Sequence, residues 1–195
     1  GENMFRKFLL ACMVMATFTM QIQAISINEL NSSSQFKNVY QKSYPYEGGS
    51  IQNKLISYLN TYSVESLEYA APHYKLKGTF YAVYETPRST SITEYELTVT
   101  YDTNYSLGSL IQAMNLVKPS PSMYAVIKAA QDESGIQVEL QEVKRYNVDG
   151  TEVISKVPLE HQLRPLDRGR FDEDLFAVAD AIFAVAYQQH FDDIV

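Results

Sequence analysis

Two stretches near the middle of the chain alternate between apolar and polar side chains. Over residues 74–85 and 95–101, one parity is rich in apolar and aromatic residues and the other mostly in polar ones. Such alternation places one face of a strand against a core and the other toward solvent. Because the turn-forming segment 87–90 joins the two runs, the sequence predicts an antiparallel hairpin with one buried face.

Further strands are expected toward the C-terminus. Residues 136–140 alternate in the same way, and the alternation changes parity near residues 142–143, which indicates a β-bulge. The Asp149-Gly150 pair is typical of a type I′ hairpin turn, and it leads into a strand over residues 151–157.

Three other stretches repeat apolar residues every three or four positions, as amphipathic helices do: 50–62, 107–117 and 172–190. The last is apolar around most of its circumference, so it should lie deep against the sheet or be shared with a partner. Residues 123–131 fit either a helix or a strand. We favour the strand, because a clear strand follows at residue 136.

These elements predict an α+β fold. Its antiparallel sheet has about five strands, a hairpin plus a three-strand meander, and its helices pack mainly on one face. The expected organisation is a cloning remnant at residues 1–3, a signal peptide at 4–24, an irregular lead-in at 25–49 and a single α+β domain at 50–195.

The N-terminal segment has the three parts of an export signal. Arg6 and Lys7 form a positive start, residues 8–18 are apolar, and Ala24 is a small residue suited to a cleavage site. We therefore expect a periplasmic or secreted protein. An uncleaved membrane anchor over residues 8–27 is the alternative, although it would place threonine and glutamine in lipid.

Charge and cysteine content narrow the partners and the compartment. Removal of residues 1–24 takes away two basic residues and one acidic residue, which moves the formal net charge from −7 to −8. An acidic chain is a poor partner for nucleic acid or anionic membranes. The single cysteine, Cys12, lies inside the signal, so the remainder folds without disulfides and fits a bacterial periplasm.

No set of residues typical of catalysis emerges. The histidines His73, His161 and His190 are scattered, and none is spaced from another as metal ligands on one element. Nucleophile and phosphate-binding motifs are missing from the sequence, so we expect no catalytic residue, no metal and no cofactor.

Two groups of aromatic residues are the candidate ligand- or partner-binding positions. One face of the hairpin would carry Tyr74, Phe80, Tyr84, Tyr95 and Tyr101, and the lead-in carries Tyr44 and Tyr46. The hairpin residues would form core if the last helix covers them, or line an apolar pocket if it covers them in part.

A cluster of arginines before the last helix offers another possible site. Arg168 and Arg170, with Arg164 nearby, could hold an anion at the helix N-terminus, or could pair with the acidic residues beside them.

Three functions remain open. The first is an exported, non-enzymatic accessory or binding protein that acts through contacts with a protein partner or a second copy. The second is a carrier or sensor of a small apolar ligand held between the sheet and the last helix. The third is a hydrolase without a recognisable motif, which would need His73 or His161 beside a carboxylate.

Overall fold

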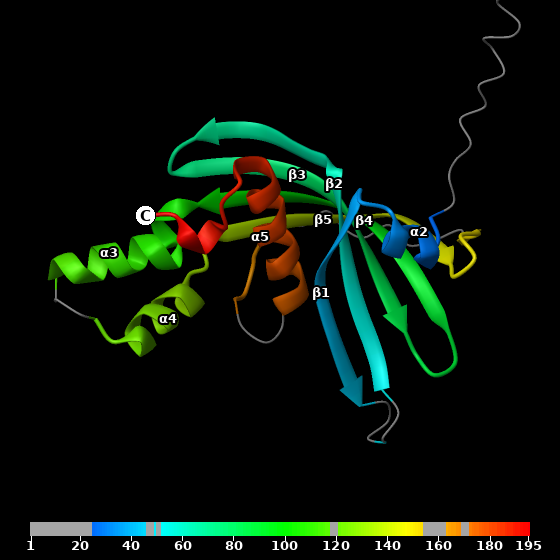
Figure 1. Ribbon diagram of the computed structural model, residues 1–195. Coiled ribbons are helices and arrows are strands. Elements are labelled where there is room, and N and C mark those ends of the chain that lie inside the picture. The colour runs from blue at the N-terminus through cyan, green and yellow to red at the C-terminus, as the bar shows by residue number, and fades with distance from the viewer. Residues whose placement is uncertain (1–24, 46–48, 50–51, 118–120, 154–162, 169–171) are drawn as a thin grey trace, which may run out of the picture.

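The computed structural model describes residues 25–45, 49, 52–117, 121–153, 163–168 and 172–195. Its centre is a curved antiparallel sheet whose main strands follow chain order (Figure 1). They are β1 (Phe36–Pro45), β2 (Gln52–Ala70), β3 (His73–Glu85), β4 (Thr90–Asp102), β5 (Ile136–Asn147) and β6 (Glu152–Val153), and β7 (Arg164–Pro165) pairs with β5. The predicted α+β class is confirmed, with seven strands instead of about five.

The helices do not share one face of the sheet. They are α2 (Ile27–Ser32), α3 (Leu107–Val117), α4 (Met123–Asp132) and α5 (Glu173–Tyr187). The predicted C-terminal helix is α5, which lies along the concave face, whereas α3 and α4 project beyond one end of the sheet (Figure 1). Because α2 packs on the opposite face, the expectation of helices mainly on one face holds only for α5.

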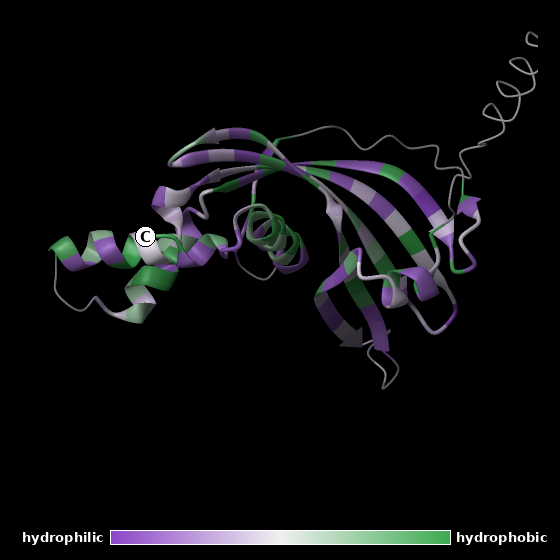
Figure 2. Cartoon of the chain, turned by 45° about the horizontal axis from the view of Figure 1, so that its top comes forward, coloured by the Kyte–Doolittle hydropathy of each residue, from purple (hydrophilic) through white to green (hydrophobic). Residues whose placement is uncertain are grey.

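The predicted hairpin is β3–β4, and its two faces pack against different helices. Tyr74 lies opposite Tyr101, and Phe80 lies opposite Tyr95. The face toward α5 carries Tyr74, Leu76, Phe80, Ala82, Tyr95, Leu97, Val99 and Tyr101. The other face joins a smaller cluster with α2 through Tyr81, Val83 and Ile92. Figure 2 shows the resulting alternation of apolar and polar positions along the strands.

The expected bulge in β5 is present. Glu142 pairs with Tyr95 and Lys144 pairs with Glu94, which leaves Val143 as the extra residue. A bulge reverses the parity of a strand. Glu142 therefore faces α5 together with the residues before it, and beyond the bulge the odd-numbered residues such as Arg145 take over that face.

The predicted helix over residues 50–62 is wrong, because β2 runs from Gln52 to Ala70. Ile56 and Tyr58 pack toward α2, whereas Leu59 packs toward α5. A strand that is buried on both faces has consecutive apolar residues, and these imitate the spacing of a helix. The lead-in is also more regular than expected, since it contains α2 and β1.

The hydrogen bonds on either side of β5 show that two local predictions are wrong, the strand over residues 123–131 and the type I′ turn at Asp149-Gly150. Residues 123–131 are helical, because Ser122 caps α4 by accepting a hydrogen bond from the amide of Ala125. The turn into β6 is not type I′. Gly150 has φ 87° and donates to the carbonyl of Asn147, as in a type I turn that ends in a glycine bulge.

The contact between β4 and α5 generates a stability prediction. The hydroxyl of buried Tyr101 donates to the carbonyl of Ala179 at 2.7 Å. Tyr101→Phe should lower the free energy of unfolding by about 1 kcal/mol, or roughly 2–4 °C in Tm. Tyr62→Phe is the control, because Tyr62 is 76% exposed. Equal Tm values for the two variants would mean that the buried hydrogen bond contributes nothing.

Candidate functional site

Helices α3 and α4, here called the helical arm, bury few of their residues. Helix α3 has 11 residues and buries none of them, and α4 buries only Val126 and Ala130. Helices of this length are rarely stable alone in water. The arm therefore depends on the contacts at its base, and its sides remain available to a partner.

The arm carries a concentration of exposed apolar side chains. Of the fourteen exposed large apolar residues in the described chain, five lie within it: Leu116, Val117, Met123, Tyr124 and Ile127. Leu116 is 86% exposed and Val117 is 89% exposed. Figure 2 shows apolar, green segments in both helices, interrupted by polar ones. Grouped exposure of this kind marks interaction surfaces.

An open apolar groove of about 620 Å³ lies between the two helices. It is lined by Leu110, Ala113, Met114, Val117, Pro121, Ser122 and Ala125. Residues 107–132 contain only three charged residues, Lys118, Lys128 and Asp132, in a chain with 16 basic and 23 acidic residues. The arm is thus a charge-poor region of an acidic protein.

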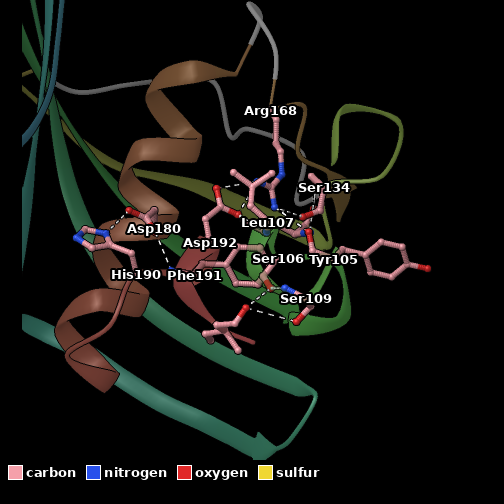
Figure 3. Close-up of polar contacts among 12 residues, drawn as sticks. Tyr105, Ser106, Leu107, Ser109, Ser134, Arg168, Asp180, His190, Phe191 and Asp192 are labelled. Atoms are coloured by element: carbon pink, nitrogen blue, oxygen red, sulfur yellow. Dashed lines mark hydrogen bonds and ion pairs between the residues drawn. The ribbon is translucent and has the colours of Figure 1, made fainter. Parts of the chain in front are cut away.

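Arg168 holds the base of the arm (Figure 3). Its side chain is only 8% exposed, and Nη1 donates to both carboxylate oxygens of Asp192 at 2.5 and 2.7 Å. Nη2 donates to the carbonyls of Tyr105, before α3, and Ser134, after α4. The guanidinium also lies over the rings of Phe176 and Phe191. One buried cation therefore joins both ends of the arm to the C-terminus.

Residues 188–195, here called the C-terminal strap, complete this attachment. Asp192 accepts a hydrogen bond from the amide of Leu107, which places a negative charge at the N-terminus of α3. Ser106 donates to the carbonyl of Ile194 at 2.7 Å and caps α3 by accepting from the amide of Ser109. A Cβ on Gly108 would lie 2.3 Å from the Ile194 carbonyl oxygen, so this contact requires glycine.

The strap is fixed in turn to α5. His190 lies beyond the end of α5, not within its last turn, and its Nδ1 is 2.6 Å from a carboxylate oxygen of Asp180. The other carboxylate oxygen of Asp180 accepts a hydrogen bond from the amide of Phe191, whose ring is buried. This chain of contacts connects α5 through the strap to the arm (Figure 3).

Of the two remaining histidines, His73 lies beside a carboxylate. His73 lies 3.7 Å from Asp102, at a cavity of about 590 Å³ that is also lined by Asp132, Glu133 and Asp167. His161 lies outside the described residues. Within the described segments, neither His73 nor His190 hydrogen-bonds to a serine or threonine hydroxyl, and no group of three potential ligands could hold a metal.

The structure distributes the predicted aromatic residues over different environments. Phe80 and Tyr101 are core residues beneath α5, and Tyr95 stacks on Phe80 at 5.2 Å. Tyr74 is half-buried and contacts Phe183 and Tyr187, whereas Tyr84 is exposed.

In the lead-in, Tyr44 lies on β1, and burial together with the charge of Asp174 raises its pKa. Tyr46 lies outside the described residues.

The predicted arginine cluster is separated into different ion pairs. Arg164 makes a two-fold hydrogen-bonded pair with Asp172, both bonds being 2.8 Å long. Arg168 is engaged by Asp192, and Arg170 lies outside the described residues. The two described guanidiniums are therefore committed to internal carboxylates.

Sequence reasoning missed the arm and its base. Residues 107–117 predicted an amphipathic helix, but no pattern indicated that its apolar side stays uncovered. The proline and serine residues at 119–122 gave a usable signal, because they fit a helix start as well as a helix end.

Comparison with known proteins adds no relative. No protein-family model matches the chain, and neither a curated protein nor a solved structure matches it. In the described part of the chain, no helix is long and apolar enough to cross a membrane.

Loss of the charge at Asp192 tests the attachment of the arm. Asp192→Asn leaves buried Arg168 without its counter-ion and should destabilise the protein by about 2–3 kcal/mol. Hydrogen exchange should accelerate in residues 103–117 and 190–195, with little change in β3 and β4. Asp193→Asn is the matched neighbour. Uniform acceleration across the chain, or equal effects of both variants, would contradict a local attachment.

The Arg164–Asp172 pair predicts a pH dependence. The hydrogen bonds from Arg164 hold the pKa of Asp172 below its usual value. The pair therefore stabilises the protein above pH of about 4, and this contribution disappears as pH falls through the lowered pKa. Thermal unfolding from pH 2.5 to 7 should show Asp172→Asn less stable than the original at pH 6–7, with the difference vanishing in acid. A constant difference would contradict this assignment.

Proposed function

We propose that this chain is an exported, non-enzymatic binding protein that acts through protein–protein contacts, with the helical arm as its contact surface. The observation that carries this proposal is the apolar groove between α3 and α4, on an arm that holds five exposed large apolar side chains. A groove between two helices fits a third helix, whose side chains pack into it as ridges into grooves.

The partner that suits this groove is an amphipathic helix of another protein with acidic residues beside its apolar stripe. In the sequence from residue 107 to residue 132 there are two basic residues, Lys118 and Lys128, and one acidic residue, Asp132; of these, Lys118 lies outside the described residues. Acidic flanks on the partner would therefore be attracted to the arm. Two copies of this chain would instead bring like-charged arms and two acidic bodies together, which disfavours self-association.

The positions of the hairpin aromatics give less support to the carrier of an apolar ligand. Phe80 and Tyr101 are packed into the core beneath α5, and Tyr101 uses its hydroxyl to bind the Ala179 carbonyl. The hydrolase has one element in its favour, the proximity of His73 to Asp102, but no serine or threonine hydroxyl of the described residues hydrogen-bonds to that imidazole. Export rests on the N-terminal signal pattern.

Site-specific crosslinking in cells tests the proposal. A photoreactive residue at Val117, in the groove, should form an adduct with a different protein, whereas the same residue at exposed Val153 should not. Sequencing of the crosslinked peptide should find an apolar helical stripe with acidic flanks. Met114→Lys, which places a charge in the groove, should reduce the adduct at least tenfold.

The alternatives give different adducts in the same experiment. Crosslinks between two copies of this chain would indicate self-association and would contradict binding to a different protein. Crosslinks to lipid, or none at Val117, would contradict a protein-binding arm.

A further inference from the structure

The cavity beside His73 lies at the base of the helical arm and has a volume of about 590 Å³. Four segments of the chain line it: the start of β3, the end of β4 with the turn after it, the end of α4 with the turn into β5, and β7 with the residues after it. The cavity shares no lining residue with the groove between α3 and α4. Its volume is in the range of cavities that hold small organic molecules.

Backbone contacts hold the walls of this cavity together. The amide of Asp102 donates to the carbonyl of Gly135 at 2.7 Å, and the amide of Leu166 donates to the carbonyl of Ile136 at 2.9 Å. Gly135 has φ 70°, and a Cβ there would lie 2.6 Å from the carbonyl oxygen of Asp102, so this approach requires glycine. The shape of the cavity is therefore built into the backbone.

Carboxylates outnumber basic groups among the described residues that line the cavity. Asp102 contributes to the wall at the end of β4, and Asp132 and Glu133 contribute at the end of α4. Asp167 lines the side after β7. Among these lining residues, His73 is the only one with a basic side chain. The cavity therefore suits a positively charged ligand.

Asp102 uses its two carboxylate oxygens differently. Oδ1 accepts a hydrogen bond from the amide of Asn104 at 3.0 Å and so caps the short helical turn that follows β4. Oδ2 lies 3.7 Å from Nδ1 of His73, which is beyond hydrogen-bonding distance. Since the side chain of Asp102 is 27% exposed, its carboxylate can accept a hydrogen bond from a ligand in the cavity.

The carboxylates at the end of α4 occupy positions that a helix disfavours. Asp132 is the last residue of α4, Glu133 is its C-cap, and the last turn contains no basic residue. The C-terminal end of a helix carries partial negative charge, so acidic side chains are unfavourable there and a cation is favourable. The charge of Glu133 and a hydrogen bond to it also raise the pKa of Tyr105. A cation in the cavity would compensate this excess of negative charge.

We propose that this cavity binds a small organic dication, with one ammonium or guanidinium group at Asp102 and the other at Asp132 and Glu133. The two groups of carboxylates belong to different segments but line one cavity. Within the described segments, no three acidic or histidine side chains are placed to hold a single metal ion. An extended molecule with a positive charge at each end can form charge-assisted hydrogen bonds with both groups.

The surrounding charges disfavour an anion in the cavity. Arg168 binds the carbonyls of two lining residues, Tyr105 and Ser134, but its charge is compensated by Asp192. The chain as a whole carries a formal net charge of −7. The local carboxylates and the net charge therefore both attract a cation.

Calorimetric titration of the whole protein with 1,4-diaminobutane dihydrochloride, at a pH of about 7.5, tests this site. Binding should be saturable, and butylammonium chloride, which has one charge, should bind at least tenfold more weakly. Sodium chloride at equal ionic strength should give no saturable heat. Asp102→Asn, which keeps the acceptor for the amide of Asn104, and Asp132→Asn should each weaken binding at least fivefold. Glu85→Gln is the matched control, since Glu85 lies at the opposite end of β3 from His73, and its affinity should be unchanged.

Stability separates a ligand site from structural carboxylates. Asp132→Asn and Glu133→Gln should not lower the Tm of the ligand-free protein, because each removes a negative charge from the C-terminus of α4. The diamine should raise the Tm of the original protein and of Glu85→Gln, and should raise it less in the two variants.

Three results would overturn the proposal: no saturable binding, equal affinity for butylammonium, or carboxylate variants that bind the diamine as well as Glu85→Gln does. None of them would bear on the groove of the arm, because the groove and the cavity share no lining residue.

Discussion

The rest of the structure depends on the contact between α5 and the concave face of the sheet. Val178, Ala179, Ile182 and Phe183 are fully or almost fully buried there. Gly78 permits this approach, since a Cβ at that position would lie 3.1 Å from the side chain of Ile182. Burial of this apolar surface is the main source of stability for a chain whose only cysteine lies at position 12.

This helix also positions the helical arm, the contact surface that we propose. Asp180, within α5, binds the strap that follows the helix, and the strap supplies Asp192 to Arg168 at the base of the arm. One helix thus supports the arm that we propose as the contact surface.

The sequence predicted the elements whose apolar residues repeat regularly along one buried face. The β3–β4 hairpin and α5 were predictable because their periodicities are long and regular. β2 was not, because α2 and α5 cover opposite faces and fill both parities with apolar residues. α4 was missed because its short apolar pattern fits either a helix or a strand. The cap at Ser122 distinguishes the two, because it marks the start of a helix.

The candidate sites were less predictable than the fold, because they depend on contacts distant in sequence. Arg168 was singled out as a possible anion ligand, but its pairing with Asp192 follows from the path of the strap. The bulge near residue 143 was visible in advance, but not the ion pair that it allows between Glu142 and Arg145.

The most direct test of a binding function is the native mass spectrum of this protein, purified gently from the cells that produce it. Our account predicts an assembly in which this chain is bound to a different polypeptide, and it predicts that Val117→Asp reduces the assembly to the chain alone. A homodimer, or a bare monomer at every concentration, would contradict the account.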